Sequence, residues 1–228
     1  LRSFGQTMLS LRRWTSDPFA DIPAIGGEAG DGSRAIRFAD ALSLAAAGYR
    51  ACRVDSRAKG DRWLWYLFLA YTGLRINEAW QVKVDDLLGL SGDCPIINVR
   101  AEIAKNRMKW KLPLHQSLVA PLREMVARNK ANRDEVTPAQ RDRFDAGFLF
   151  VMRPNLETFD RDLYAAGIPK VDAEGLAATP HSLRKAFETA LGVLGEGSEM
   201  CAYLRRHMSA LTRRYFQPSA EEMQRAIA

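Results

Sequence analysis

The chain lacks several features that would otherwise point to a function. Its three cysteines, Cys52, Cys94 and Cys201, are scattered among 228 residues without C-x-x-C spacing. That set argues against a disulfide framework and against a zinc site, and it fits a reducing cytoplasm. There is no run of 18 or more apolar residues and no signal peptide, so no membrane association is indicated. Because the first residue is Leu1 rather than Met, we expect a fragment or a trimmed chain.

Signs of metal or nucleotide chemistry are also missing. The glycine-rich segment 24–33 has no G-K-[ST] sequence and follows no predicted strand, so it is interpreted as a linker. Asp85 and Asp86 are adjacent, and adjacent side chains do not share a helix face or a strand face. No carboxylate cluster suits two-metal phosphoryl chemistry, and we expect neither a metal nor a cofactor.

Positive charge is present and unevenly distributed. The net charge is +6 and the isoelectric point is near 9.4. Residues 100–133 contain nine Lys or Arg and two Glu, a local charge of +7, whereas residues 134–162 have a local charge of −3. A basic segment beside an acidic one suggests one surface that faces phosphate and another that faces elsewhere.

Apolar periodicity predicts an α+β fold, mainly α-helical with one small antiparallel β-sheet. We expect a helix at 1–16, stopped by Pro18 and Pro23, and a new helix after Gly73. Further helices are expected at 34–50, 61–71, 116–133, 155–166, 180–194, 198–206, 208–216 and 219–227. Short strands are expected at 94–100, 101–105 and 109–114, and the apolar run 148–151 fits either a strand or a loop.

Two segments in the first half of the chain carry candidate functional residues. In TGLRINEA, Arg75 follows the Gly73 break, and Glu78 lies on the same helical face and could orient it. In AKNRMKWKLPL, Lys105 is placed at a turn between strands, where it could reach a phosphate oxygen and donate a proton. Taken alone, these segments fit equally a surface ion pair and a basic hairpin edge that deters sheet pairing. The same hairpin holds three further cations, Arg107, Lys109 and Lys111.

Two segments in the second half add histidines and a tyrosine. In PHSLRKAFET, His181 and Arg184 share one face at the start of a helix, an arrangement suited to holding an oxyanion, although a structural histidine is the alternative. In YLRRHMSALTRRYFQPSA, His207 precedes Tyr215, and Tyr203 is the other tyrosine near that histidine.

The order and spacing of these segments resemble the catalytic domain of tyrosine recombinases, the phage integrase family. The resemblance implies that Arg75 and Arg184 clamp a scissile phosphate, and that Lys105 is the general acid. His181 and His207 would hydrogen-bond the phosphate and assist proton transfer, with Tyr215 as the nucleophile. Glu78 matches an acidic position of the family that supports these residues from outside the phosphate contacts. Candidate DNA-binding residues are Arg107, Lys109, Lys111, Arg213 and Arg214.

The same resemblance implies a domain organisation, and the sequence departs from the family pattern at one position. Residues 1–23 would be the tail of a core-binding helical domain, 24–33 a flexible linker, and 34–228 the catalytic domain. The family usually has Gly immediately before the second histidine, where this sequence has Arg206. We expect Arg206 either to adopt the glycine turn with strain or to form a different turn.

The implied activity is site-specific recombination or integration through a covalent 3′-phosphotyrosyl intermediate, without ATP or metal. Its implied partners are double-stranded DNA and three further copies, as a homo-tetramer joined through the C-terminal helix. Packing of that helix on its own domain is the alternative. Three alternatives stay open: a type IB topoisomerase, an inactive DNA-binding regulator on the same fold and, more distantly, a metal-dependent nuclease. Relaxation of supercoiled DNA would indicate the topoisomerase. A function unchanged by Tyr215→Phe would indicate the regulator, and loss of activity with a chelator would indicate the nuclease.

Overall fold

The computed structural model describes residues 33–54, 61–131, 137–193, 198–206 and 218–227, all within one compact unit, Ser33–Ala228. The predicted helices at 1–16 and 208–216, and residues 1–32 of the predicted tail and linker, lie outside the described residues. The described helices are α2 (Phe38–Val54), α3 (Arg62–Thr72), α4 (Ile76–Trp80), the 3₁₀ turn η1 (Val84–Asp86), α5 (Gln116–Ala131), α6 (Pro138–Asp145), α7 (Leu156–Ala165), α8 (His181–Val193), α9 (Ser198–Arg205) and α11 (Ala220–Arg225).

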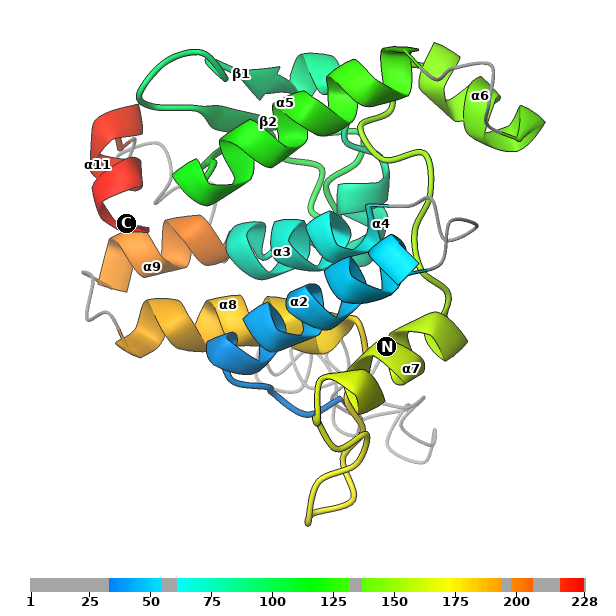
Figure 1. The fold of residues 1–228 in the computed structure, drawn as a ribbon. Coiled ribbons are helices and arrows are strands. Elements are labelled where there is room, and N and C mark those ends of the chain that lie inside the picture. Colours follow the sequence, from blue (N-terminus) through cyan, green and yellow to red (C-terminus); the bar gives the residue numbers. More distant parts are fainter. Residues whose placement is uncertain (1–32, 55–60, 132–136, 194–197, 207–217, 228) are drawn as a thin grey trace, which may run out of the picture. The chain divides into compact units, whose positions relative to one another are not determined.

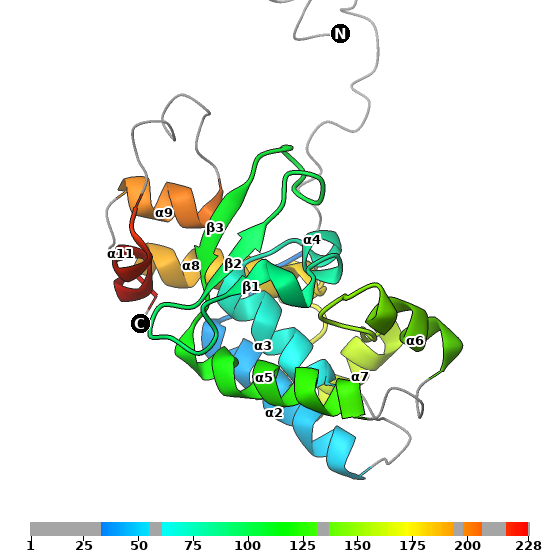
Figure 2. The same cartoon turned by 90° about the horizontal axis from the view of Figure 1, so that it is seen from above.

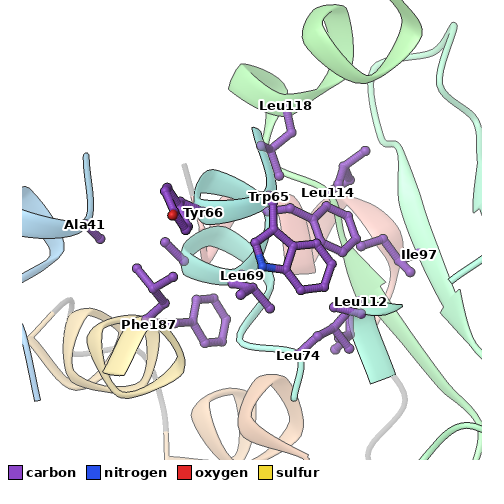
Figure 3. Close-up of a cluster of buried hydrophobic side chains, with 14 of the residues drawn as sticks. Ala41, Trp65, Tyr66, Leu69, Leu74, Ile97, Leu112, Leu114, Leu118 and Phe187 are labelled. Carbon is purple, nitrogen blue, oxygen red and sulfur yellow. The ribbon is translucent and has the colours of Figure 1, made fainter. Parts of the chain in front are cut away.

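Helix α3 lies at the centre of the domain, in contact with α2, α5 and α8 (Figure 1). Its sequence, RWLWYLFLAYT, is apolar on nearly every face, and a helix of that kind is buried all round. Trp65 and Leu69 extend from it into the same cluster as Ile97 and Leu112 of the sheet (Figure 3). The core therefore joins the helices to the sheet through α3.

Gly73 ends α3 in a left-handed conformation, with φ at 57° and its N–H bonded to the carbonyl of Leu69. A Cβ at this position would lie 2.2 Å from Cδ1 of Phe187, on α8. Only glycine meets both demands, because it tolerates positive φ and has no side chain to clash. The predicted break at Gly73 and the new helix after it are confirmed by α4.

The sheet has three antiparallel strands in the order β1 (Leu87–Leu88), β2 (Ile96–Val99) and β3 (Trp110–Pro113). Ile97 pairs with Leu112 and Val99 with Trp110, so the predicted strands at 94–100 and 109–114 are confirmed in their centres. The predicted strand at 101–105 is wrong. There the N–H groups of Ile103 and Ala104 bond to the carbonyl of Arg100, which winds the segment into turns.

Helix α6 was not predicted, because none of its residues is buried and no apolar spacing marks it. The local signal for it is a capping box, in which Thr137 and Gln140 bond reciprocally, followed by Pro138 in the first turn. Arg143 attaches α6 to α4 by stacking 3.5 Å from the ring centroid of Trp80. Residues 148–151 form a loop with a single bridge between Phe148 and Lys83.

Helix α11 packs on strand β3 of its own chain. Met223 and Ala226 are buried there, and the amide of Gln224 donates to the carbonyls of Pro95 and Leu114, at 3.0 Å each. Figure 2 shows α9 and α11 on one side of the domain and α6 on the other. In the part of the chain described, no helix has the length and apolar character needed to cross a membrane.

Candidate functional site

Arg75 and Glu78 form the start of α4, directly after the turn at Gly73. Arg75 is the N-cap in an extended conformation, and its backbone N–H donates to Oε2 of Glu78 at 3.0 Å. Its guanidinium donates to Oε1 of the same carboxylate at 3.1 Å, while 33% of the Arg75 side chain remains exposed. Glu78 therefore orients the arginine, and the turn at Gly73 sets where both begin.

Glu78 also receives two partners from distant segments. The backbone N–H of Lys105 donates to its Oε1 at 3.2 Å, and Nη1 of Arg206 lies 2.5 Å from its Oε2. Burial alone would raise the pKa of Glu78. The charge of Arg206 and the hydrogen bonds from Arg75, Arg206 and Lys105 outweigh burial and lower this pKa. The carboxylate is thus ionised and joins three parts of the chain.

Arg184 enters from the first turn of α8 and is buried. Its guanidinium donates to the carbonyl of Gly73 and, at 3.2 Å, to the carbonyl of Arg205, and it lies 2.6 Å from Glu188. Burial, reinforced by the nearby charge of Arg206, lowers the pKa of Arg184 to about 10. The side chain is still charged at neutral pH and is held in one orientation.

Arg206 occupies the position where a glycine was expected, and it does adopt the left-handed conformation, with φ at 60°. For a residue with a Cβ this conformation costs about 1–2 kcal/mol. The side chain turns into the protein, where Nη2 donates to the carbonyl of Gly73 at 3.0 Å. Of the two expected alternatives, a strained left-handed turn and a different turn, Arg206 therefore adopts the left-handed one.

Lys105 lies in the connection between β2 and β3, as predicted, with its side chain exposed. Arg107, Lys109 and Lys111 are exposed on the same connection and on β3. His181 is the first residue of α8, one turn before Arg184, and is partly exposed. Its backbone N–H donates to Oγ1 of Thr179 at 3.2 Å. Tyr203 is buried, with its ring stacked edge-on against Trp110 at 5.5 Å.

The fold thus brings together Arg75, Glu78, the backbone of Lys105, and Arg184. Sequence reasoning missed that the side chain of Arg206 belongs to the same cluster, and only its departure from glycine marked it. His207, Tyr215, Arg213 and Arg214 lie outside the described residues. Three arginines share two carboxylates here, Glu78 and Glu188, which leaves a positive excess suited to an anion. No group of three or more His, Cys, Asp or Glu among the described residues could hold a metal ion.

Comparison with known proteins fits this arrangement. The model of the phage integrase family matches residues 46–222, more than half of the chain. The chain belongs to the phage integrase family. A search of curated proteins finds no match.

Solved structures of recombinases and of an integrase share the fold. The XerH site-specific recombinase, in a pre-cleavage complex with its difH substrate, has a TM-score of 0.56 and 18% identity over 84% of this chain. XerA recombinase has a TM-score of 0.52 and 24% identity over 82% of this chain. The Tn1549 transposon integrase bound to transposon right end DNA has a TM-score of 0.55 and 17% identity over 99% of this chain and 75% of its own.

These likenesses establish the tyrosine-recombinase catalytic fold. This integrase-family chain spans 53% of the XerH chain and 62% of the XerA chain.

Proposed function

We propose that this protein is a site-specific DNA recombinase or integrase that cuts and rejoins DNA through a covalent 3′-phosphotyrosyl intermediate. The observation that carries the proposal is the cluster around Glu78. Arg75, Arg184 and the segment of Lys105 come from three distant parts of the chain, and two buried acceptors, Glu78 and the Gly73 carbonyl, hold them together. Membership of the phage integrase family and the DNA-bound neighbours XerH and Tn1549 integrase support the same function.

In the proposed reaction the phenol of Tyr215 gives its proton to a histidine of the site or to solvent, and its oxygen attacks the scissile phosphorus. A bond forms between that oxygen and phosphorus, and the bond from phosphorus to the 5′-oxygen breaks. Lys105 gives a proton to the leaving 5′-oxygen. The reverse reaction, attack by a 5′-hydroxyl on the phosphotyrosine, rejoins the strand without ATP because the energy of the broken bond is retained.

The cations lower the barrier at two points. A tyrosine with a pKa of about 10 needs roughly 4 kcal/mol to ionise at pH 7, so a group must accept its proton or positive charge must stabilise the phenolate. Arg75 and Arg184 would bind the non-bridging oxygens, where fixed donors stabilise developing charge best. The planar guanidinium matches two phosphate oxygens at once, which a lysine does not. His181 and His207 would hydrogen-bond the phosphate and assist proton transfer.

The environment of Tyr203, the alternative nucleophile, supports the choice of Tyr215. Tyr203, the other tyrosine near His207 in the sequence, is 7% exposed and packed against Trp110. A phenol in that environment would have to leave the core to reach DNA, at the cost of its apolar contacts.

The proposed DNA partner would lie along the exposed cations Arg107, Lys109 and Lys111, with Arg213 and Arg214 as further candidates. The homo-tetramer through the C-terminal helix stays a prediction. It requires α11 either to leave Pro95 and Leu114 or to meet a second copy with its outer face.

Covalent capture tests the proposed function on DNA of any sequence, so the target site need not be chosen beforehand. Duplexes of random sequence, each with a nick that lets the cleaved end diffuse away, are incubated with the full chain. Adducts that survive detergent are isolated and sequenced. We expect adducts with a shared sequence, resistant to a chelator and absent with Tyr215→Phe.

Failure to recover more adduct than the Tyr215→Phe control would overturn the proposal. DNA binding without any adduct would favour the inactive regulator. Relaxation of supercoiled plasmids that lack the selected sequence would favour the topoisomerase.

A further inference from the structure

Arg206 is strained in its backbone, and both terminal nitrogens of its side chain, Nη1 and Nη2, donate hydrogen bonds within the protein. It is one of two non-glycine residues with positive φ among those described, and its N–H bonds to the carbonyl of Tyr203 at the end of α9. A glycine there would avoid the strain, and the family usually has one. An arginine at this position therefore needs a compensating role, and its side-chain contacts indicate which one.

The Arg206 side chain crosses from the end of α9 to the start of α4. It pairs with Glu78 at 2.5 Å, and the two side chains are 2% and 3% exposed. It also donates to the carbonyl of Gly73, which accepts from Arg184 as well. These contacts link residue 206 to the two acceptors that orient Arg75 and Arg184.

The same carboxylate fixes the backbone of Lys105. A shift of Arg206 would therefore disturb the acceptor that holds Arg75 and the backbone of Lys105 together. Nη1 and Nη2 of Arg206 donate to the acceptors that also hold Arg75 and Arg184, so its contacts assign this side chain to holding the site together.

We propose that Arg206 is a positioning residue of this site, which holds the end of α9 in register with Arg75, the backbone of Lys105 and Arg184 through Glu78 and the Gly73 carbonyl. The proposal rests on the proposed function. It adds Arg206, whose buried side chain links the end of α9 to the start of α4 where the family usually has a glycine. It predicts that Arg206 acts on the rate of strand cleavage far more than on DNA affinity.

The matched control is Arg62, at the opposite end of α3. Arg62 also pairs with a buried carboxylate, Asp162, at 2.8 Å, although its own side chain is 15% exposed. It lies about 16 Å along the helix from Gly73, at 1.5 Å per residue. Substitutions at Arg62 therefore report the loss of an ion pair to a buried carboxylate without displacing the residues of the site.

The experiment compares Arg206→Gly, Arg206→Ala and Arg206→Lys with Arg62→Ala and Arg62→Lys. Single-turnover adduct formation is measured on the nicked duplex recovered by covalent capture, below the melting temperature of each variant. DNA affinity is measured in a Tyr215→Phe background. We expect Arg206→Gly and Arg206→Ala to form adduct about 10²-fold more slowly, as displacements near 1 Å do, with affinity unchanged within about threefold.

Two further readouts separate positioning from folding. Methylguanidinium added to Arg206→Ala should restore part of the rate, and Arg206→Lys should fall between the wild type and Arg206→Ala. The Arg62 variants should lose comparable thermal stability yet cleave at a rate within about threefold of the wild type.

The outcomes are distinguishable. A wild-type protein that forms no adduct overturns the proposed function. A wild-type protein that forms adduct while Arg206→Gly matches its rate overturns the positioning role alone. Equal slowing by the Arg62 and Arg206 variants at matched loss of stability also overturns it, because the effect would then be general.

Discussion

The two ends of helix α3 use the same residue types in opposite ways. At its start, Asp162 accepts two bonds from Arg62, at 2.8 and 3.1 Å, and one from the hydroxyl of Tyr66 at 2.9 Å, while Asp61 pairs with Arg128. Two carboxylates there meet two arginines. Beyond its end, at Gly73, Glu78 and Glu188 are shared among three arginines.

The pKa values follow this difference. Burial lowers the pKa of Arg62, but the hydrogen bond and charge of Asp162 more than reverse it, so the pKa is raised. At Arg184 burial is reinforced by Arg206, and the pKa falls to about 10. At the balanced end each arginine charge is compensated by a carboxylate, whereas an end with excess positive charge is suited to receive an anion from outside.

The largest expected effect is on DNA affinity. If six to ten phosphates are contacted, affinity for duplex DNA should fall about 10³- to 10⁵-fold between 50 and 200 mM salt. Lys109→Gln should reduce the slope of that dependence by about one, whereas Arg128→Gln, at the balanced end, should leave it unchanged. Fluorescence anisotropy titrations at several salt concentrations measure this. A nearly flat dependence would contradict phosphate binding.

Arg184→Lys should slow adduct formation about 10²- to 10³-fold. A single ammonium cannot keep the contacts to the carbonyls of Gly73 and Arg205 and also bind two phosphate oxygens. Single-turnover cleavage of the captured duplex gives the rate, and Arg62→Lys is the control at the other end of α3. Cleavage by Arg184→Lys at the wild-type rate would contradict the proposed role of Arg184 in binding the phosphate.

Gly73→Ala should lower the free energy of unfolding by about 2–4 kcal/mol, from left-handed strain and from overpacking against Phe187. Gly147→Ala is the matched control, because Gly147 has φ at 77° but nothing within 4 Å of an added Cβ. It should lose only about 1 kcal/mol. Urea unfolding of both variants compares them, and equal losses would show that the contact with Phe187 is readily relieved.

Glu78→Gln should cost about 1–3 kcal/mol of stability at neutral pH, because Arg206 is left buried beside a neutral partner. The lowered pKa of Glu78 means that its contribution is present above its unfolded pKa, about 4.3, and is lost as pH falls through the folded pKa. The difference between wild type and variant should therefore shrink in acid. Urea unfolding at pH 7 and at a series of pH values below the unfolded pKa of about 4.3 measures it. A constant difference would mean that Glu78 does not titrate there.

Local sequence patterns predicted the elements that carry the first part of this site. The apolar helix α3, the break at Gly73 and the ion pair between Arg75 and Glu78 all depend on neighbours within a few residues, so periodicity and turn chemistry suffice. The convergence with Lys105 and Arg184 followed from the order of motifs within a family, since no local rule brings such distant segments together.

What could not be predicted depends on distant contacts or on weak signals. Arg206 bonds to a carboxylate 128 residues earlier, and nothing in its own neighbourhood specifies that partner. The segment 101–105 has strand-like residues, yet Ile103 and Ala104 are buried in turns. Helix α6 lacks a buried face, so only its capping box marked it.

Mass spectrometry of the covalent adduct tests the central claim most directly. After nuclease and protease digestion of the captured complex, the residual nucleotide should be attached through a 3′-phosphate to the peptide containing Tyr215. Attachment to Tyr203 or to any other residue, or adduct that persists in Tyr215→Phe, would contradict the account of the site.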